Sequence, residues 1–237
     1  MAVHERYSDY VSDQSKFFDE LITEDWHTYS STEWDQTRRF ETAQLFERIQ
    51  PRHVLDIGCG CGFHDAEMAN YAFVEHVDAI DPSAASIAQA EKSYPHSKVS
   101  RRVGSFESLP PSGQYDLAVS IDVFEHTDQP DDYFRHVTAA VRPGGHVAII
   151  TPNRRRWGNL TRMSTGKKPL LLSTMHWREY IFSELLTLGE RHGLKHVQSF
   201  GHGIYGPWTN WMTHEQRLRV GAKIPAIAHV IGVVFQK

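Results

Sequence analysis

The sequence predicts an α/β fold, in which a doubly wound, mostly parallel sheet is covered by helices on both faces. From residue 51 onward, short apolar segments alternate with segments of helical periodicity. The first apolar segment runs directly into a glycine-rich loop, and 40% of the 237 residues are hydrophobic, which is an ordinary globular composition. Such alternation is typical of βαβ units, whose parallel strands are buried between two layers of helices.

The first part of the expected sheet consists of strands joined by helices. The strands are His53–Ile57, His76–Asp81, Lys98–Gly104, Asp116–Ile121 and His146–Thr151. The helices between them are Phe63–Ala72, Ala84–Ser93 and Pro130–Val141. Pro143-Gly144-Gly145 is expected to break the chain before the fifth strand, because proline and glycine interrupt regular structure.

The flanking regions are less regular. Residues 1–50 are polar and aromatic, with an expected helix at Asp35–Ile49, where apolar residues recur at roughly helical spacing. Residues 152–168 are expected to form a loop or short helices, followed by a helix at Phe182–Arg191. Two last strands, Leu194–Phe200 and His229–Phe235, are separated by a polar segment rich in Gly, Trp and Pro.

Composition excludes several classes of protein. The formal net charge of −4 creates no global field that would select nucleic acid or a membrane as partner. Residues 1–13 lack the apolar stretch of a signal peptide, and no apolar run reaches the roughly 20 residues that span a bilayer. Cys59 and Cys61 lie too close for an unstrained disulfide, and two cysteines at this spacing fall short of a zinc site. A cytoplasmic protein is therefore expected.

The strongest functional signal is the run from Val54 to Gly62, which reads Val-Leu-Asp-Ile-Gly-Cys-Gly-Cys-Gly. A buried strand enters a loop with glycine at every second position, and a helix follows. Glycine lets the backbone turn sharply and lets a ligand approach without meeting a Cβ atom. Asp81, at the end of the second strand, can accept hydrogen bonds from both hydroxyls of an adenosine ribose.

Two classes of nucleotide-like ligand use this layout. Dinucleotides need the spacing G-x-G-x-x-G, which brings a pyrophosphate to the helix N-terminus. Here the third glycine comes one residue early, and Asp56 stands two residues before Gly58. A carboxylate at that point repels a pyrophosphate but suits a ligand that carries an ammonium and a sulfonium group. The loop thus favours S-adenosylmethionine over NAD, and a nicotinamide-dependent dehydrogenase is the disfavoured alternative.

Over about residues 36–200 the sequence resembles the class I S-adenosylmethionine-dependent methyltransferases, and among them the group of ubiquinone-biosynthesis O-methyltransferases. The matching stretches are Val54–Gly62, Asp78–Ser83, Tyr115–Leu117, Asp122–His126, Arg142–Gly145, Thr151–Arg154 and His176–Tyr180. The resemblance implies a Rossmann-like, seven-stranded sheet whose last strand is antiparallel. A length of 237 residues fits one domain, so we expect a single methyltransferase domain over residues 1–237, with an N-terminal helical cover (1–50), a cofactor-binding core (51–151) and an acceptor-side part (152–237).

The same resemblance implies which residues hold the cofactor. Glycines of the loop would line its methionine and ribose portion, and Asp81 would hold the ribose. Arg38 would face the cofactor carboxylate, although a solvated helix arginine is the alternative. Where relatives often have an acidic residue for the adenine amino group, Ser105 would accept a hydrogen bond and Phe106 would stack on the ring. The expected set is Arg38, Asp56, Gly58, Cys59, Gly60, Gly62, Asp81, Pro82, Ser105, Phe106 and Ile121.

The acceptor is expected where the fourth strand ends, at Asp122, Glu125 and His126, because such sheets bind ligands at the carboxyl edge. An oxygen acceptor loses a proton, so a base or a metal is needed there. His126 is the favoured base. Alternatively, the three residues bind a divalent cation with His176, a pattern resembling that of ubiquinone and small-RNA 2′-O-methyltransferases, or Glu125 and His126 cap the next helix. We interpret most other histidines as surface residues.

A basic stretch follows the fifth strand, with no acidic residue between Asn153 and Lys168. Its charged residues are Arg154, Arg155, Arg156, Arg162, Lys167 and Lys168. It would bind an anionic acceptor or an anionic membrane surface, or else it is a solvated loop. The expected function is methyl transfer to a small molecule, at a hydroxyl oxygen, with S-adenosylhomocysteine as product. The alternatives are 2′-hydroxyl methylation of RNA, which the net acidity disfavours, and cofactor binding without turnover.

Overall fold

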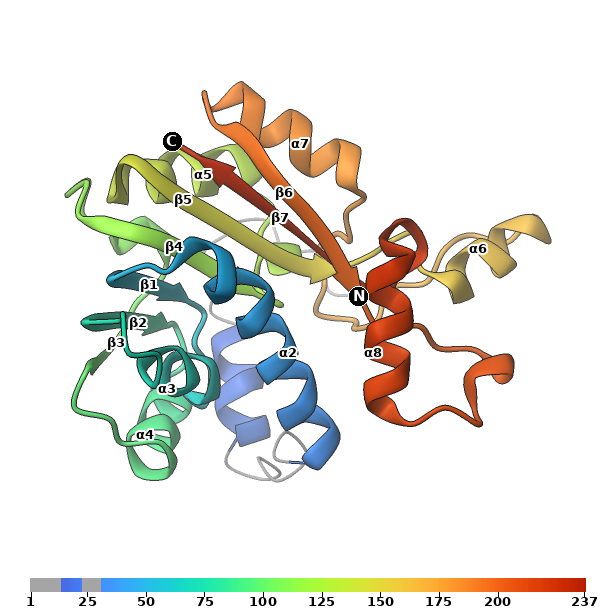
Figure 1. Ribbon diagram of the computed structural model, residues 1–237, viewed down its shortest axis with the longest axis horizontal. Helices are drawn as coiled ribbons and strands as arrows, with labels where there is room; N and C mark the ends of the chain where they lie inside the picture. The colour runs from blue at the N-terminus through green and yellow to red at the C-terminus, as the bar shows by residue number, and fades with distance from the viewer. Residues whose placement is uncertain (1–13, 23–30) are drawn as a thin grey trace.

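A seven-stranded sheet forms the centre of the computed structural model, which describes residues 14–22 and 31–237 (Figure 1). The strands are β1 (His53–Ile57), β2 (His76–Asp81), β3 (Val99–Val103), β4 (Tyr115–Ile121), β5 (Val141–Pro152), β6 (Lys195–His202) and β7 (Val230–Gln236). The expected N-terminal cover includes residues 1–13 and 23–30, which lie outside the described residues.

The strand order is β3-β2-β1-β4-β5-β7-β6. Strands β1 to β5 pair in parallel, and β7 runs antiparallel to both β5 and β6. The predicted fold, a mostly parallel sheet of seven strands with an antiparallel last strand, is confirmed. From the centre, the chain proceeds outward from β1 to β2 on one side and from β4 to β5 on the other. The loops after β1 and β4 therefore diverge and leave a crevice at the carboxyl ends.

Helices cover both faces of this sheet. They are α2 (Thr32–Ile49), α3 (Phe63–Ala69), α4 (Ala84–Ser93), α5 (Pro130–Ala140), α6 (Trp157–Ser164), α7 (Phe182–Arg191) and α8 (His214–Lys223). Tyr133 of α5 and Leu185 of α7 belong to one buried apolar cluster, whereas Phe46 of α2 and Met68 of α3 belong to another. Among the described residues, no helix is long and apolar enough to cross a membrane.

The predicted break at Pro143-Gly144-Gly145 is wrong, because β5 begins at Val141 and runs through these residues. The pairing of β4 with β5 shifts register between Tyr115 and Leu117. Gly144 has a φ of 78°, and a Cβ atom on Gly145 would lie 3.0 Å from the Tyr115 carbonyl oxygen. The glycines thus allow the strand to continue through an irregularity that a larger residue would interrupt.

Helix α8 lies within the segment that the sequence predicts as a polar connection. Thr213 and Gln216 form a capping box at its start: Thr213 Oγ1 accepts from the Gln216 N–H at 3.2 Å, and Gln216 Oε1 accepts from the Thr213 N–H at 2.9 Å. The helix packs closely on the end of β6, where a Cβ atom on Gly221 would lie 2.4 Å from Gly203 N. The Thr-x-x-Gln pattern was the available signal, but apolar residues are too few in α8 to give a clear periodicity.

A buried ion pair joins the edge strand β3 to α3, the helix that follows the glycine loop. Arg101 Nε and Nη2 donate to the two carboxylate oxygens of Asp65, each at 2.7 Å. The side chains are 1% and 0% exposed. This bidentate geometry offsets the cost of removing both charges from water.

We expect Arg101→Met to lower the free energy of unfolding by about 3–5 kcal/mol, because Asp65 would remain buried without its partner. Urea-induced unfolding followed by circular dichroism measures the change. Arg135→Met is the matched control, since Arg135 forms an exposed pair with Asp132 that is worth about 0.2–1 kcal/mol. Equally small losses in both variants would contradict the structural role of Arg101.

Candidate active site

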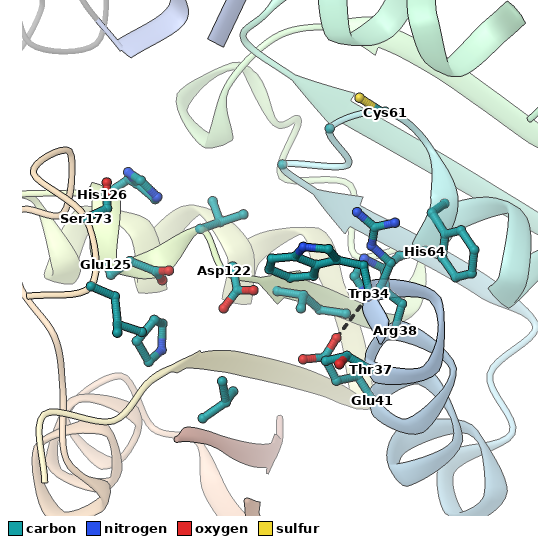
Figure 2. A pocket seen from close by; sticks show the side chains of 18 of the residues that line it. Trp34, Thr37, Arg38, Glu41, Cys61, His64, Asp122, Glu125, His126 and Ser173 are labelled. Carbon is teal, nitrogen blue, oxygen red and sulfur yellow. Dashed lines mark hydrogen bonds and ion pairs between the residues drawn. The ribbon is translucent and has the colours of Figure 1, made fainter. Parts of the chain in front are cut away.

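A cavity of about 740 Å³ opens at the carboxyl ends of the central strands. Its walls come from the helix at residues 14–22, from α2, from the glycine loop, and from the segments that follow β4, β5 and β6. Figure 2 shows Cys61 of the glycine loop at one side and Glu125, His126 and Ser173 at the other, with Asp122 between them. The cavity therefore joins the expected cofactor half to the expected acceptor half.

The three glycines of the loop are needed for different structural reasons. Gly58, Gly60 and Gly62 all have positive φ angles, of 75°, 52° and 83°. A Cβ atom on Gly58 would lie 2.3 Å from a methyl group of Val123, and one on Gly62 would lie 2.6 Å from the Cβ of Ala90. A Cβ on Gly60 would meet nothing within 4 Å. Gly58 and Gly62 are thus required by packing, and Gly60 leaves open backbone facing the cavity.

Asp81 lines the cavity and also holds the glycine loop. Its Oδ2 accepts from the Gly60 N–H at 2.9 Å, and its Oδ1 accepts from the Ser83 N–H at 2.8 Å. Burial raises the pKa of this carboxyl to about 6, and the two backbone hydrogen bonds oppose that rise. Each carboxylate oxygen has a second lone pair, so Asp81 can accept from a ligand while it keeps the loop in place.

Most residues of the expected cofactor set line the cavity, namely Arg38, Gly58, Cys59, Gly60, Asp81, Pro82 and Ile121. The Arg38 guanidinium lies 5.6 Å from the Trp34 ring centroid and 5.1 Å from that of Phe63. It also pairs with Asp35 at 3.7 Å. Arg38 is thus held at the cavity wall instead of extending into solvent.

Asp56 and the two residues expected at adenine lie elsewhere. Asp56 is buried beneath the loop, and its Oδ2 has no hydrogen-bond partner among the described residues. Burial raises the pKa of Asp56 well above its usual range, and Asp65 and Asp81 add to this. The ring of Phe106 packs edge-on against that of Tyr133, with centroids 5.3 Å apart, and the Ser105 hydroxyl donates to the Glu107 carboxylate. None of the three lines the cavity in this structure.

Asp122 has an unusual backbone for its residue type. Its φ angle is 54°, and its N–H donates to the Ile150 carbonyl at 2.9 Å, which holds it at the end of β4. Its Oδ1 is buried and has no hydrogen-bond partner among the described residues. Burial raises the pKa of Asp122 to about 7, and the charge of Glu41 acts in the same direction. A strained, desolvated carboxyl at this edge is typical of a functional position.

Glu125, His126 and His176 come together on the acceptor side of the cavity. Each offers a donor atom, and these atoms lie within 4.8 Å of one another. The His126 and His176 rings meet edge to face with centroids 4.9 Å apart. Glu125 is fully buried: its Oε2 accepts from the Thr151 hydroxyl at 2.8 Å, and its Oε1 lies 3.9 Å from His176 Nε2. Burial raises its pKa well above the usual range.

His126 is held by the segment that carries His176. Its Nδ1 lies 3.1 Å from the Met175 carbonyl oxygen and 3.1 Å from Gln14 Nε2. Burial lowers the pKa of His126 to about 4, and His176 lowers it further, so the imidazole is neutral at pH 7. The side chains of Glu125 and His126 do not cap α5, whose first turn follows Gln129 without a side-chain cap. The helix-capping alternative is therefore not supported.

Most of the remaining histidines were expected at the surface, but four of them line the cavity, namely His64, His202, His214 and His229. Glu41, a buried residue of α2 that the sequence did not single out, lies 2.9 Å from His202 Nε2 and 3.1 Å from His64 Nε2. These hydrogen bonds lower the pKa of Glu41 to about 2 against the effect of burial. The Thr37 hydroxyl lies 2.7 Å from His214 Nε2. Such pairs join segments far apart in the chain, so local patterns carry no signal for them.

The basic stretch is only partly free to bind an anion. Arg154 pairs with Glu184 at 2.8 Å, and buried Arg156 pairs with Glu179. Both acidic partners lie beyond the stretch in sequence but beside it in space. The exposed members are Arg155, Lys167 and Lys168. Arg154 and Arg156 therefore stabilise the acceptor-side loops.

Comparisons with known proteins agree with this geometry. Residues 29–199 match the family model described as a methyltransferase domain. The ubiquinone biosynthesis O-methyltransferase of Bradyrhizobium sp. is 27% identical over 159 residues, which cover 63% of this chain and 61% of that protein. The tRNA U34 carboxymethyltransferase of Hahella chejuensis is 31% identical over 139 residues, which cover 57% and 40% of the two chains. The chain thus spans less than two thirds of the length of these relatives.

Solved structures share the fold. The N1-methyltransferase of Burkholderia thailandensis with bound 1,6-didemethyltoxoflavin and S-adenosylhomocysteine superposes with a TM-score of 0.68 and 18% identity. The superposition covers 100% of this chain and 92% of that chain. The family model covers most of the sequence, and its matched range includes the glycine loop and Asp81. The chain belongs to the class I S-adenosylmethionine-dependent methyltransferases, and S-adenosylmethionine is its cofactor.

Proposed function

We propose that this enzyme transfers the methyl group to a hydroxyl oxygen of a small molecule that binds beside His126. The observation that carries the proposal is a half-buried, neutral imidazole in the same cavity as the glycine loop. A hydroxyl acceptor needs such a group, because its proton must leave as the new bond forms. The name of the Bradyrhizobium relative, an O-methyltransferase, agrees with this choice of atom.

The chain supplies orientation and a proton acceptor. When bound, S-adenosylmethionine supplies an electrophilic methyl group, and its sulfur keeps the electron pair of the broken S–C bond. The acceptor oxygen forms the new C–O bond and releases its proton. In the tautomer whose Nδ1–H donates to the Met175 carbonyl, Nε2 of His126 carries the lone pair that receives this proton. We expect the cavity walls to limit the access of water to the methyl group and to the acceptor oxygen.

The side chains of Glu125, His126 and His176 also fit a divalent cation. Two imidazoles and a carboxylate are common ligands of transition metals, and Glu125 Oε1 has no hydrogen-bond partner among the described residues. Asp122 is not part of that group of close donor atoms. A cation held there would stabilise the deprotonated acceptor oxygen, and this remains the alternative to a base mechanism.

We expect Asp81→Ala to weaken binding of S-adenosylmethionine by about 1.5–3 kcal/mol, which is roughly 10- to 150-fold, because charge-assisted hydrogen bonds to the ribose are lost. Calorimetric titration measures the affinity, and NAD serves as a ligand that should not bind. Since Asp81 also holds the loop, the melting temperature of the variant must be measured in parallel. Unchanged affinity would place the ribose elsewhere.

We expect His126→Ala to reduce turnover by about two orders of magnitude and to leave cofactor affinity nearly unchanged. Release of S-adenosylhomocysteine, measured over a panel of hydroxyl acceptors, gives the rate. His53→Ala is the control, because His53 lies at the opposite end of β1 and is half exposed. Loss of activity with a chelator and recovery with Mg²⁺ would favour the cation alternative. Activity that survives both the substitution and the chelator would reject both roles.

We further propose that the exposed basic patch, formed by Arg155, Lys167 and Lys168 with the neighbouring Leu170 and Leu171, docks on an anionic surface. Leu170 and Leu171 are 53% and 42% exposed beside these charges, a combination that suits the interface of an anionic membrane. An anionic acceptor inside the cavity is less well supported, because Glu41, Asp122 and Glu125 line the acceptor half. The patch therefore acts outside the cavity.

We expect the protein to cosediment with vesicles that contain phosphatidylglycerol but not with phosphatidylcholine vesicles, and high salt should release it. Replacing Arg155, Lys167 and Lys168 together with Gln should weaken binding by about 1 kcal/mol for each residue. The matched control replaces the exposed residues Arg48, Lys92 and Lys195 with Gln, which changes the net charge equally. Equal binding by both triple variants would contradict the proposal. Binding to single-stranded RNA in place of vesicles would favour the RNA alternative.

A further inference from the structure

The acceptor half of the cavity contains more buried carboxylate than a hydroxyl acceptor requires. Glu41 comes from α2, Asp122 follows β4, and Glu125 lies in the short 3₁₀ helix Phe124–His126. In Figure 2 the Asp122 side chain lies between those of Glu125 and Glu41. Burial raises the pKa of Asp122 and of Glu125; the charge of Glu41 adds to this rise at Asp122, and the charge of Asp122 adds to it at Glu125.

These carboxylates are compensated unequally. Glu41 is balanced by His202 and His64, at 2.9 and 3.1 Å. By contrast, Asp122 Oδ1 and Glu125 Oε1 are buried and have no hydrogen-bond partner among the described residues. Arg38 and His202 also face Asp122. Arg38, however, already pairs with Asp35 and lies over the rings of Trp34 and Phe63.

Buried polar atoms without partners are costly, so a bound molecule is expected to satisfy these two oxygens. An anion would oppose ionisation of both carboxyl groups in a site of low dielectric and would find no opposite charge in them, which disfavours it. A neutral hydroxyl donates one hydrogen bond and can satisfy only one of the oxygens. A protonated amine donates three hydrogen bonds and brings the opposite charge, which favours the ionised form of both carboxyl groups.

We propose that Asp122 and Glu125 bind a cationic group of the acceptor, such as a primary ammonium, so that the substrate is an amine-bearing molecule. This inference rests on the proposed function, because it assigns the substrate class of the same cavity. The ammonium would orient the acceptor and would place its reacting hydroxyl near His126. Glu41 is already matched by its two histidines and does not bind the group directly.

The competing occupant of these oxygens is the cofactor itself, whose sulfonium is also a cation. S-adenosylhomocysteine lacks that charge, so protein saturated with it leaves the carboxylates available. The test titrates benzylamine, benzyl alcohol and benzoate into this complex, with a chelator present so that no divalent metal competes. The three probes share a ring and differ in charge, and calorimetry measures their affinities without any need for turnover.

We expect benzylamine to bind about tenfold more tightly than benzyl alcohol, with benzoate weakest of the three. Asp122→Asn should reduce the preference for the amine to about threefold or less, and Asp122→Asn with Glu125→Gln should abolish it. These substitutions are nearly isosteric, and the affinity for S-adenosylhomocysteine, measured first, reports whether the variant is folded. Asp132→Asn is the matched control, because the Asp132 side chain on α5 is half exposed, and this variant should keep the full preference.

Three results would overturn the proposal. One is binding of benzoate as tight as that of benzylamine. Another is a preference for the amine that survives in the double variant. The third combines two observations: the parent protein shows no preference among the probes, and Asp122→Asn binds S-adenosylmethionine more weakly but S-adenosylhomocysteine equally well. That result would assign the carboxylates to the sulfonium. If S-adenosylhomocysteine does not bind the parent protein, the proposed function fails before any probe is added, and this inference fails with it.

Discussion

The carboxylate of Asp81 provides the contact on which the cofactor half of the cavity depends. It accepts hydrogen bonds from the backbone N–H groups of Gly60 and Ser83, so one side chain fixes the loop after β1 against the loop after β2. The N–H groups of Gly58 and Cys59 donate to the Ile80 carbonyl and draw the same two strand ends together. Only a loop that tolerates positive φ at alternate residues can follow this path. The glycine spacing and the acidic residue at the end of β2 are thus one structural unit.

Buried ionisable groups lie on two sides of this unit. Behind the loop, Arg101 neutralises Asp65, whereas Asp56 Oδ2 has no hydrogen-bond partner among the described residues, and burial raises the pKa of Asp56. On the acceptor side, Asp122 and Glu125 are likewise desolvated. A fold can retain such groups only where paired charges or a ligand compensate them. The uncompensated carboxyl groups of the cavity therefore lower the stability of the free protein and favour the binding of a ligand that compensates them.

Local sequence patterns predicted the features of the structure that depend on neighbouring residues in the chain. The alternation of apolar strands and helices, the glycine loop and Asp81 were all readable, because each depends on a short segment or on a fixed topology. Helix α8 was missed because its face is mostly polar, and Pro143-Gly144-Gly145 was misread because a bulge depends on the partner strand. Glu41 with His202, and Arg156 with Glu179, join residues far apart in the chain. No periodicity reveals such pairs, so the sequence indicated neither the histidines that line the cavity nor the ion pairs of Arg154 and Arg156.

The helix at residues 14–22 connects the two halves of the cavity. Asp19 accepts from the Ser83 hydroxyl at 2.6 Å, next to the strand end that carries Asp81. Gln14 lies 3.1 Å from His126 Nδ1 and donates to the Met175 carbonyl, which also contacts His126. A single helix thus contacts Ser83, close to the carboxylate expected to bind the ribose, and His126, the expected base. Because it covers both at once, a change in its position would alter the access of water to the cofactor and the orientation of His126 together.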